Sequence, residues 1–461
     1  MLRIEGRGGA FCDGASRRSF LKIGAVSMGG AATLPLSDLL RAEGRAGRSL
    51  GHKALINIYL PGGLTLHESW DPKPDAPEGI RGPFGTIATK VPGVRICELF
   101  PKIASRMDRV SIVRSIFGCE EHHDGYQCTS GWLRPDLKTL GGRPSVGSAT
   151  WKLKGAVDPG VPPHIGLGET KYAAYAESGS AGFLGEAYQP FKPHSSGRYA
   201  GSYAFTRNFS LSDMKLRGMS LEKLQERRTL LASLDRLKRQ ADASGLLQSV
   251  DGYTQTAFEV LTSGRLVDAL DLEKEDPRVR DRYGDGRPYA HKFDAAHTVN
   301  HNILLARRLV EAGARSVSVS YGSWDHHSRL VERMNYFAPR LDHVVTTLLE
   351  DLDQSGLLQD VTVAVWGEFG RTPRVNNKGG RDHWPRTNGV LLFGGGTNAG
   401  QVVGATNRLG EDPVSRPVHI QQVIATLYHN LGIDTMTATL TDPNGRPRYL
   451  LKHRDPISEL I

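Results

Sequence analysis

Short runs of apolar residues recur along the chain and end at polar or glycine-rich turns. Each run is seven or eight residues long, a length that suits a strand better than a helix. The later runs are nearly continuous rather than alternating, as is typical of strands buried on both faces of a sheet. The pattern predicts strands at residues 54–60, 109–116, 315–321, 361–367 and 390–396.

Longer segments with apolar residues at helical spacing lie between these runs. They predict helices at residues 221–240, 293–314, 340–356 and 417–432. Glycines end three of them, at Gly313, Gly356 and Gly432, as expected where a helix closes in a left-handed turn. Because strands and helices alternate, we expect an α/β fold with a mostly parallel central sheet and helices on both faces.

Residues 155–215 lack this periodicity and are rich in Gly, Pro, Ser and Tyr. They predict a loop-rich insertion, acting as a lid or a substrate-binding segment. The 461 residues suffice for one large α/β domain or two ordinary ones. No internal repeat divides the chain, so we predict a single domain over residues 46–461.

Carboxylates and imidazoles gather directly beside the predicted strands. In open α/β sheets, ligands bind where the carboxyl ends of the strands meet. Five loops could therefore deliver polar side chains to one edge, which makes a chance surface distribution a weaker explanation. These loops carry His67, Glu68 and Asp71; Glu120, Glu121, His122, His123 and Asp124; Asp325, His326 and His327; Glu368 and Arg371; and Arg381, Asp382 and His383.

The spacing of Asp325 and His327 indicates a metal site. In an extended segment, residues two apart share a face, so both could reach one ion while His326 points away. A carboxylate with a neutral imidazole suits Zn²⁺ or Mn²⁺. The alternative is a polar loop facing solvent.

The stretch from Glu368 to His383 admits two interpretations at each position. Glu368 is either a metal ligand or the ion-pair partner of Arg371. Arg371 and Arg381 suit bidentate binding of a phosphate or sulfate, or they tie loops together. His383 is a candidate ligand, with Asp382 as a ligand or as the group that orients it.

The net charge of the chain adds little to this interpretation. Lys and Arg number 58 against 49 Asp and Glu, a net charge of +9. No long basic tract or interleaving of basic and aromatic residues occurs, so we favour a mildly basic exported protein over a nucleic-acid binder.

The N-terminus carries an export pattern. Arg17 and Arg18 lie in SRRSFLK, followed by a weakly apolar segment rich in Gly and Ala, which predicts a twin-arginine signal at residues 1–45. We therefore expect recognition by the twin-arginine translocation machinery and a periplasmic or secreted protein. No later run of 18 apolar residues predicts a membrane span. Beyond the signal, Cys97, Cys119 and Cys128 allow one disulfide and a spare thiol, or three buried thiols.

Several long motifs resemble one bacterial family. LPGGLTLHESWDPKPDAPEGIRGPFG, HHDGYQCTSGWL, LEKEDPRVRDRYG, SVSVSYGSWDHH and GEFGRTPRVNNKGGRDHWP occur in this order. Together they are similar to the family called "domain of unknown function 1501", over roughly residues 50–455. The resemblance implies an alkaline-phosphatase-like α/β core in the alkaline phosphatase and sulfatase superfamily, and a metal-dependent hydrolase.

The resemblance also implies roles for individual residues. It suggests that a divalent ion (Zn, Mn or Ca) is held by Asp325, His327, Glu368, His383 and Asp71. We expect Arg371 and His123 to act in catalysis, and Arg381, Asp382 and His122 to bind substrate.

The chain departs from the superfamily pattern at three points. Phe369 stands where the superfamily places a histidine. The first strand ends in Pro-Gly-Gly, and Asp71 comes only later. The nucleophile has no clear position, with Ser115, Cys119 and Thr129 as candidates.

Two functions follow from these features. The first is an exported hydrolase of phosphate or sulfate esters, acting on a small molecule or a glycan. The second is a non-catalytic relative that binds a sulfated or phosphorylated glycan or a partner protein.

Overall fold

The computed structural model describes residues 50–168, 179–193, 223, 259, 263–287 and 298–461. The predicted signal at 1–45 and the predicted helix at 221–240 lie outside these residues, apart from Lys223. The described residues of 50–353 and 357–461 belong to one compact unit. No helix among the described residues is long and apolar enough to cross a membrane.

An eight-stranded sheet forms the centre of this unit, with strand order β11-β4-β10-β7-β1-β6-β5 and β14 paired to β4. Its longer strands are those predicted from the apolar runs. The strands are β1 (Ala54–Tyr59), β4 (Ser111–Phe117), β5 (His164–Leu167), β6 (Ser316–Ser320), β7 (Val361–Trp366), β10 (Asn388–Gly394), β11 (Val402–Val403) and β14 (Val418–His419).

Strand β10 alone runs against the others in this sheet, because it pairs antiparallel with both β4 and β7. The remaining pairings are parallel. The carboxyl ends of the parallel strands therefore share an edge with the start of β10. The mostly parallel α/β sheet is confirmed.

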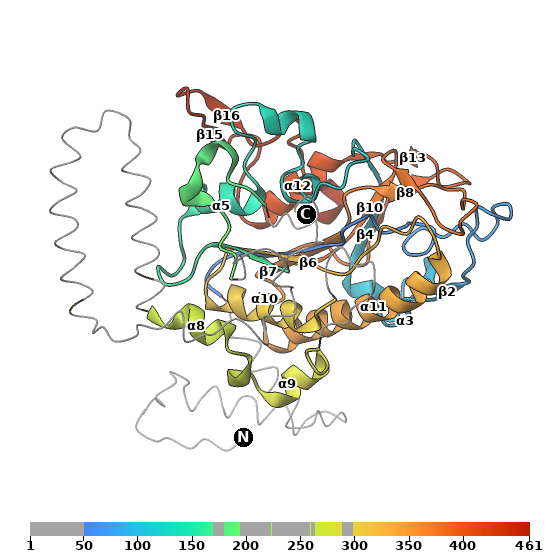
Figure 1. Ribbon diagram of the computed structural model, residues 1–461, viewed down its shortest axis with the longest axis horizontal. Coiled ribbons are helices and arrows are strands. Elements are labelled where there is room, and N and C mark those ends of the chain that lie inside the picture. Colours follow the sequence, from blue (N-terminus) through green and yellow to red (C-terminus); the bar gives the residue numbers. More distant parts are fainter. Residues whose placement is uncertain (1–49, 169–178, 194–222, 224–258, 260–262, 288–297) are drawn as a thin grey trace, which may run out of the picture. The chain divides into compact units, whose positions relative to one another are not determined.

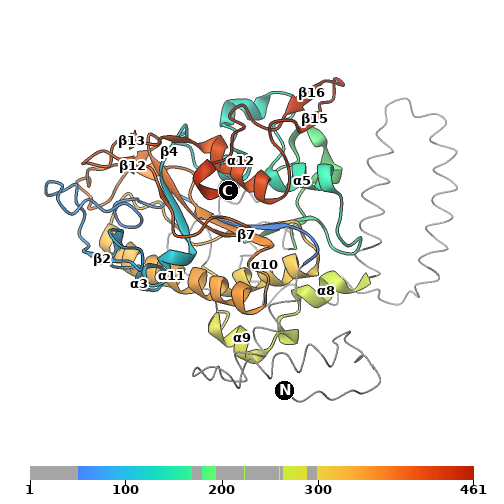
Figure 2. The same cartoon turned by 180° about the vertical axis from the view of Figure 1, so that it is seen from behind.

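Helices cover both faces of the sheet (Figures 1 and 2). In β1, Ile56 and Ile58 pack into one apolar core, whereas Leu55 and Tyr59 pack into the other. This alternation explains the continuous apolar run, since both faces of the strand are covered. The first core joins α3 (Pro101–Ala104), α8 (Arg265–Leu270), α10 (Asn300–Ala312) and α11 (Leu330–Gln354), and the second joins α4 (Tyr126–Ser130), α5 (Val146–Lys154) and α12 (Ile420–Asn430).

Smaller elements decorate this core. Helix α9 spans Pro277–Arg282. Four two-stranded pairs complete the described strands: β2 (Thr86–Ala88) with β3 (Arg95–Cys97), β8 (Gly370–Arg371) with β9 (His383–Trp384), β12 (Ala405–Thr406) with β13 (Pro413–Ser415), and β15 (Thr439–Thr441) with β16 (Pro447–Tyr449).

Helix α11 begins ten residues before its predicted start at 340, since it opens at Leu330 and passes through Pro339. A proline inside a helix removes a backbone hydrogen bond. Met334, Phe337 and Leu341 are nonetheless buried at helical spacing. Burial of this apolar face outweighs the local signal of the proline.

The range 155–215 contains more than loop. Within its described part, His164–Leu167 forms strand β5, which pairs with β6 at the end of the sheet. Four buried residues are too few to give a periodic signal, so the sequence did not reveal the strand.

Cys97, Cys119 and Cys128 are free thiols. Cys97 and Cys128 are buried, and Cys119 is half-buried. The structure therefore favours the three-thiol alternative over a disulfide among these residues.

Buried His67 makes the fold sensitive to acid. Its Nε2 contacts the carbonyl oxygen of Leu409 at 2.9 Å. Burial, helped by the charge of Arg381, lowers the pKa of His67 to about 4. The neutral ring thus stabilises the fold fully above the ordinary histidine pKa of ~6.5, and this stability is lost as pH falls through about 4.

We predict that His67→Gln flattens the pH dependence of the free energy of unfolding between pH 6.5 and 4. Summed over this pH range, the acid-induced loss in the free energy of unfolding should be smaller in the variant by at most about 3 kcal/mol. Urea unfolding at several pH values measures it. Exposed His429 provides the control, because His429→Gln should follow the unmodified protein. Parallel curves for His67→Gln and the unmodified protein would contradict the prediction.

Candidate metal centre

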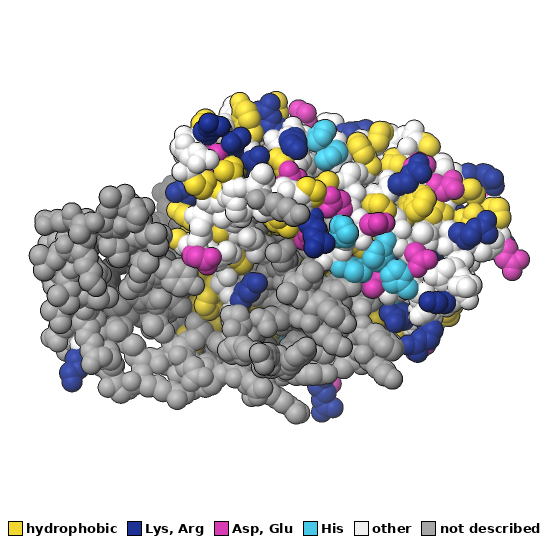
Figure 3. Space-filling model, turned by 45° about the horizontal axis from the view of Figure 1, so that its top comes forward, with side chains coloured by type: hydrophobic (Ala, Val, Ile, Leu, Met, Phe, Trp, Pro, Cys, Tyr) yellow, Lys and Arg dark blue, Asp and Glu magenta, His cyan; other side chains and the backbone are white. Residues whose placement is uncertain are grey.

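Three imidazoles and one carboxylate meet beyond the carboxyl edge of the sheet: His123, Asp325, His327 and His383. His123 follows β4, Asp325 and His327 follow β6, and His383 lies in β9 on the way into β10. Figure 3 shows histidine side chains gathered on one face, with charged side chains around them. The topology thus brings together three of the five loops expected to converge.

Three ligand atoms of this cluster form a compact triangle. Asp325 Oδ1 lies 3.0 Å from His327 Nε2 and 3.2 Å from His383 Nε2. The two Nε2 atoms are 3.0 Å apart. Four-coordinate Zn²⁺ with nitrogen and oxygen ligands at ~2.0–2.1 Å needs ligand atoms roughly 3.3 Å apart, so the triangle is close to the size a metal requires.

Hydrogen bonds on the outer ring nitrogens orient two of the imidazoles. His327 Nδ1 lies 2.5 Å from Asp382 Oδ1, and His383 Nδ1 lies 2.8 Å from the carbonyl oxygen of Glu121. Both partners are acceptors, so each Nδ1 carries the hydrogen. In the neutral rings both Nε2 lone pairs then face Asp325, an arrangement that a cation satisfies.

His123 completes the cluster from the other side of the carboxylate. Its Nε2 lies 3.3 Å from Asp325 Oδ2, and its Nδ1 lies 3.1 Å from Glu368 Oε1. The ring thus bridges the cluster and a carboxylate that is fully buried. The backbone N–H of Gly62 donates to both oxygens of Glu368, at 2.9 and 3.1 Å.

These contacts shift the protonation of the cluster. Burial acts against ionisation of Asp325, but hydrogen bonds that the three histidines donate when they are protonated, with the Arg371 charge, hold its pKa well below its usual range. Burial lowers the pKa of His123, yet the hydrogen bonds to Asp325 and Glu368 prevail and raise it to about 9. The hydrogen bond to Asp325 likewise raises the pKa of His327.

His326 lies on the opposite side from its two neighbours. Its Nε2 contacts the carbonyl oxygen of Ser323 at 2.9 Å, and its ring stacks on Phe337. Burial, with the charges of Arg371 and Arg333, lowers its pKa to about 3. A neutral core histidine therefore separates Asp325 from His327 in the sequence.

Arg371 is not placed to clamp a ligand. Its side chain is 1% exposed. It donates to the carbonyl oxygens of Gly62, Gly63 and Arg381 and, at 2.5 Å, to Asp325 Oδ1. Because these contacts engage the guanidinium, Arg371 positions the loops and Asp325, and its catalytic role stays a prediction.

Arg381 is equally inaccessible to a substrate, with a fully buried side chain. Its Nε and Nη2 donate to the Glu68 carboxylate at 2.9 and 2.6 Å. Its remaining donors reach carbonyl oxygens of Thr372, Pro373 and Ile80. The pair ties the loop before β10 to the loop after β1, which is the structural alternative considered for Arg381, and the substrate-binding role stays a prediction.

Two other expected ligands lie outside the cluster. In the contacts described above, His123 is the one member of the cluster that Glu368 touches. Asp71 instead pairs with Lys73 at 3.0 Å and Arg114 at 3.2 Å, and accepts a hydrogen bond from Thr406. Asp71 and Asp325 are more than 250 residues apart in the sequence, so the sequence alone could not show that Asp71 lies away from the cluster.

The two remaining candidates differ in their surroundings. Asp382 is exposed and accepts hydrogen bonds from His327 and from Asn376, the latter at 3.1 Å. The hydrogen bond to His327 lowers the pKa of Asp382. It therefore orients a ring of the cluster. His122 is exposed beside His123.

The candidate nucleophiles have other partners. Ser115 Oγ donates to the carbonyl oxygen of Arg416 at 2.6 Å, and Thr129 is buried and contacts Tyr126. Burial, with the nearby Glu368 charge, raises the pKa of Cys119 to about 12, so its reactive thiolate is scarce at neutral pH.

Gly62, Gly63 and Phe369 belong to the centre although the sequence marked them only as departures from a pattern. A Cβ on Gly62 would lie 2.3 Å from Asp325 N, and one on Gly63 would lie 2.3 Å from Phe369 O. Phe369 is fully buried, and its ring centroid lies 4.4 Å from that of His383. The glycines permit close backbone approach, and Phe369 packs the imidazole in place.

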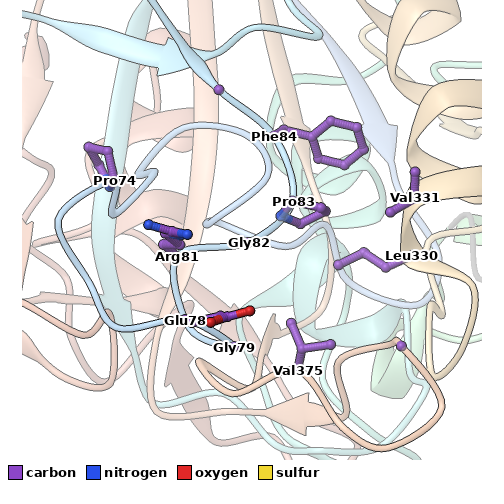
Figure 4. Close-up of a pocket in the computed structure, with 12 residues that line it drawn as sticks. Pro74, Glu78, Gly79, Arg81, Gly82, Pro83, Phe84, Leu330, Val331 and Val375 are labelled. Carbon is purple, nitrogen blue, oxygen red and sulfur yellow. The ribbon is translucent and has the colours of Figure 1, made fainter.

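Two hollows flank the loops of the centre. The larger, of about 610 Å³, lies between residues 74–85, the start of α11 and residues 375–379. In Figure 4, Phe84, Leu330 and Val331 gather on one side of it and Arg81 and Glu78 on the other. The smaller, of about 490 Å³, is lined by residues 117–119, 385–386, 412–413 and 417.

Comparison with known proteins identifies one family. Residues 52–461 match the family described as "Protein of unknown function (DUF1501)", which confirms the resemblance seen in the motifs. No curated protein matches the chain. A solved structure, the PsFucS1 sulfatase from Pseudoalteromonas sp., aligns with 12% identity over 88% of this chain and 73% of its own, with a TM-score of 0.34. A likeness this distant carries no argument about activity.

We predict that Arg381→Met lowers the free energy of unfolding by about 3–5 kcal/mol, because it leaves the buried Glu68 carboxylate unpaired. The double variant Glu68→Leu/Arg381→Met should recover much of the loss, since no lone charge remains buried. Denaturant unfolding of both single variants and the double variant completes the cycle.

The exposed pair Lys90–Asp108 gives a matched control, in which Lys90→Met should change stability by less than about 1 kcal/mol. An Arg381→Met protein of unchanged stability that no longer binds ligand would instead restore the substrate-binding role.

Proposed function

The chain belongs to the DUF1501 family of proteins of unknown function, and we propose that it is an exported, metal-dependent hydrolase of phosphate or sulfate esters. The observation that carries the proposal is the convergence of imidazole Nε2 atoms on Asp325, with Nδ1 of His327 and of His383 bound to an oxygen acceptor. A divalent ion held there supplies a Lewis acid that lowers the pKa of water and withdraws charge from an ester oxygen.

Asp325, His327 and His383 are the ligands in this proposal. Two imidazoles and one carboxylate suit Zn²⁺ or Mn²⁺, whereas Ca²⁺ prefers oxygen ligands alone. Of the three ions expected from the sequence, the donor set therefore favours the first two. Asp382 and the Glu121 carbonyl hold the imidazoles in the ligating tautomer.

His123 is the proton donor. It hydrogen-bonds to two carboxylates, Asp325 and Glu368, which favour its charged form. It contacts Asp325 Oδ2, whereas the two ligand imidazoles contact Oδ1. Glu368, buried and fixed by the Gly62 N–H, is the positioning residue behind it.

The nucleophile is water, because Ser115, Thr129 and Cys119 are engaged elsewhere or protonated. The water oxygen bonds to phosphorus or sulfur while the bond from that atom to the alcohol oxygen breaks. His123 gives its proton to the departing oxygen and then takes the proton that the water releases. The acid is thereby regenerated, and the products are an alcohol and inorganic phosphate or sulfate.

Export and superfamily membership are parts of the same proposal. The twin-arginine pattern at residues 16–22 supports a periplasmic or secreted enzyme that reaches its compartment folded, with its metal already bound. The mostly parallel sheet with the centre at its carboxyl edge is compatible with an alkaline-phosphatase-like fold.

Burial of both arginines favours a second candidate function. With Arg371 and Arg381 inaccessible, charge on a bound anion would be met, within the described cluster, by the ion and His123. A relative that binds a sulfated or phosphorylated glycan or a partner protein without turning it over would need no further cation.

We predict separate effects for the ligands and for the proton donor. Asp325→Asn and His383→Ala should weaken Zn²⁺ or Mn²⁺ binding by about 100-fold or more, since even the partners of ligands contribute about 10–100-fold. His123→Ala should retain the metal and lower kcat by about 10²–10⁴-fold. Elemental analysis after reconstitution and rates on 4-nitrophenyl phosphate, 4-nitrophenyl sulfate and sugar esters provide the measurements.

His429→Ala is the matched control, because this exposed histidine does not belong to the cluster and should affect neither quantity. If His123→Ala lost metal as His383→Ala does, His123 would be a fourth ligand and not the acid. A folded protein that takes up no metal and hydrolyses none of the esters would refute the hydrolase.

A further inference from the structure

The smaller hollow and the metal centre share two chain segments. Residues 117–119 line the hollow and lead to His123, and residues 385–386 line it directly after His383 and Trp384. Two residues of extended chain span at most roughly 7 Å. The backbone of the hollow at Pro385 therefore lies close to the backbone of the cluster residue His383, so one ligand could reach both.

One part of the hollow is apolar and lies on strands of the central sheet. Phe117 ends β4, is 37% exposed, and packs edge-on against His419, with ring centroids 5.3 Å apart. His419 in turn pairs with Phe117 across β14 and β4. Pro385, Pro413 and Pro417 add further apolar rings. Most of these residues belong to or adjoin strands, so the surface is preformed.

A bidentate ion pair lines the same hollow. Arg386 donates through Nε and Nη2 to the two carboxylate oxygens of Asp412, both at 2.7 Å. The two side chains are 59% and 37% exposed. Each carboxylate oxygen keeps a further lone pair, and the guanidinium keeps further N–H groups. The pair can thus accept and donate hydrogen bonds to one ligand without either charge being left unpaired.

A preformed apolar surface beside paired donors and acceptors selects a particular chemistry. An acyl chain would make no hydrogen bonds with the Arg386–Asp412 ion pair. A second charged group would have to displace one partner of that pair. A sugar ring offers an apolar face of C–H groups and a rim of hydroxyls that both donate and accept. The volume of about 490 Å³ is that of a site for a small organic group.

We propose that this hollow is a subsite for a pyranose ring, namely the alcohol part of the ester whose phosphate or sulfate lies at the metal centre. The inference rests on the proposed hydrolase function and names its substrate class. The ring packs on Phe117, and its hydroxyls exchange hydrogen bonds with Asp412 and Arg386.

The test compares sugar esters with an aryl ester on the metal-loaded protein. Monosulfates and monophosphates of methyl pyranosides and 4-nitrophenyl sulfate and phosphate serve as substrates for Phe117→Ala, Asp412→Asn and Val414→Ala. Phe117→Ala and Asp412→Asn should raise KM for the best sugar ester roughly 10-fold or more, and change kcat/KM for the aryl esters less than about twofold. Val414, 64% exposed beside Pro413, is the control and should change neither.

Binding of the unesterified methyl pyranosides, followed by ligand-observed NMR, separates the subsite from the hydrolase. If no ester is hydrolysed but a pyranoside binds and Phe117→Ala abolishes its binding, the subsite stands and the hydrolase fails. If aryl esters are hydrolysed while no sugar ester is preferred, or Phe117→Ala leaves KM for sugar esters unchanged, the subsite is refuted and the hydrolase stands.

Discussion

The buried guanidinium of Arg371 is the interaction on which the centre depends. It follows β7 and hydrogen-bonds to Gly62 and Gly63 after β1, to Asp325 after β6 and to the Arg381 carbonyl before β10. Four loops from different parts of the chain are therefore held by one planar group. Flexible loops alone would place ligand atoms with errors larger than a metal tolerates, whereas a five-donor fork fixes several backbones at once.

Burying this charge would be unfavourable without compensation. Asp325 and Glu368 lie in the same region, and Glu68 compensates Arg381 nearby. The carboxylates thus serve two purposes: they offset buried arginines, and they orient or join the imidazoles. Such networks commonly contribute less stability than apolar packing would. Here the network fixes the relative positions of four loops, which apolar contacts between mobile loops would not do.

Much of this was accessible from the sequence, and the limits have physical causes. The apolar runs predicted the five main strands because these strands are buried on both faces. The Asp325-x-His327 spacing predicted a shared face because extended chain alternates. The sequence could not separate a ligand from a residue that orients one, as with Glu368 and Asp382, since both need the same side chains. It also assigned Arg371 and Arg381 to a ligand, because burial of a loop arginine depends on tertiary contacts with residues some 300 positions away, such as Gly62 and Glu68.

The same burial determines where selectivity for a substrate can reside. In the proposed hydrolase, a phosphate or sulfate at the centre would meet neither buried guanidinium, so within the described cluster the anion would be recognised by the bound ion and by His123. These groups respond to charge and to lone pairs, and they distinguish one ester from another only weakly. Discrimination must then come from the part of the substrate that extends beyond the centre. Phe369 closes one side by packing on His123 and His383. Two segments lead away from those two histidines, towards Phe117 and Arg386. The alcohol part of an ester can be recognised there.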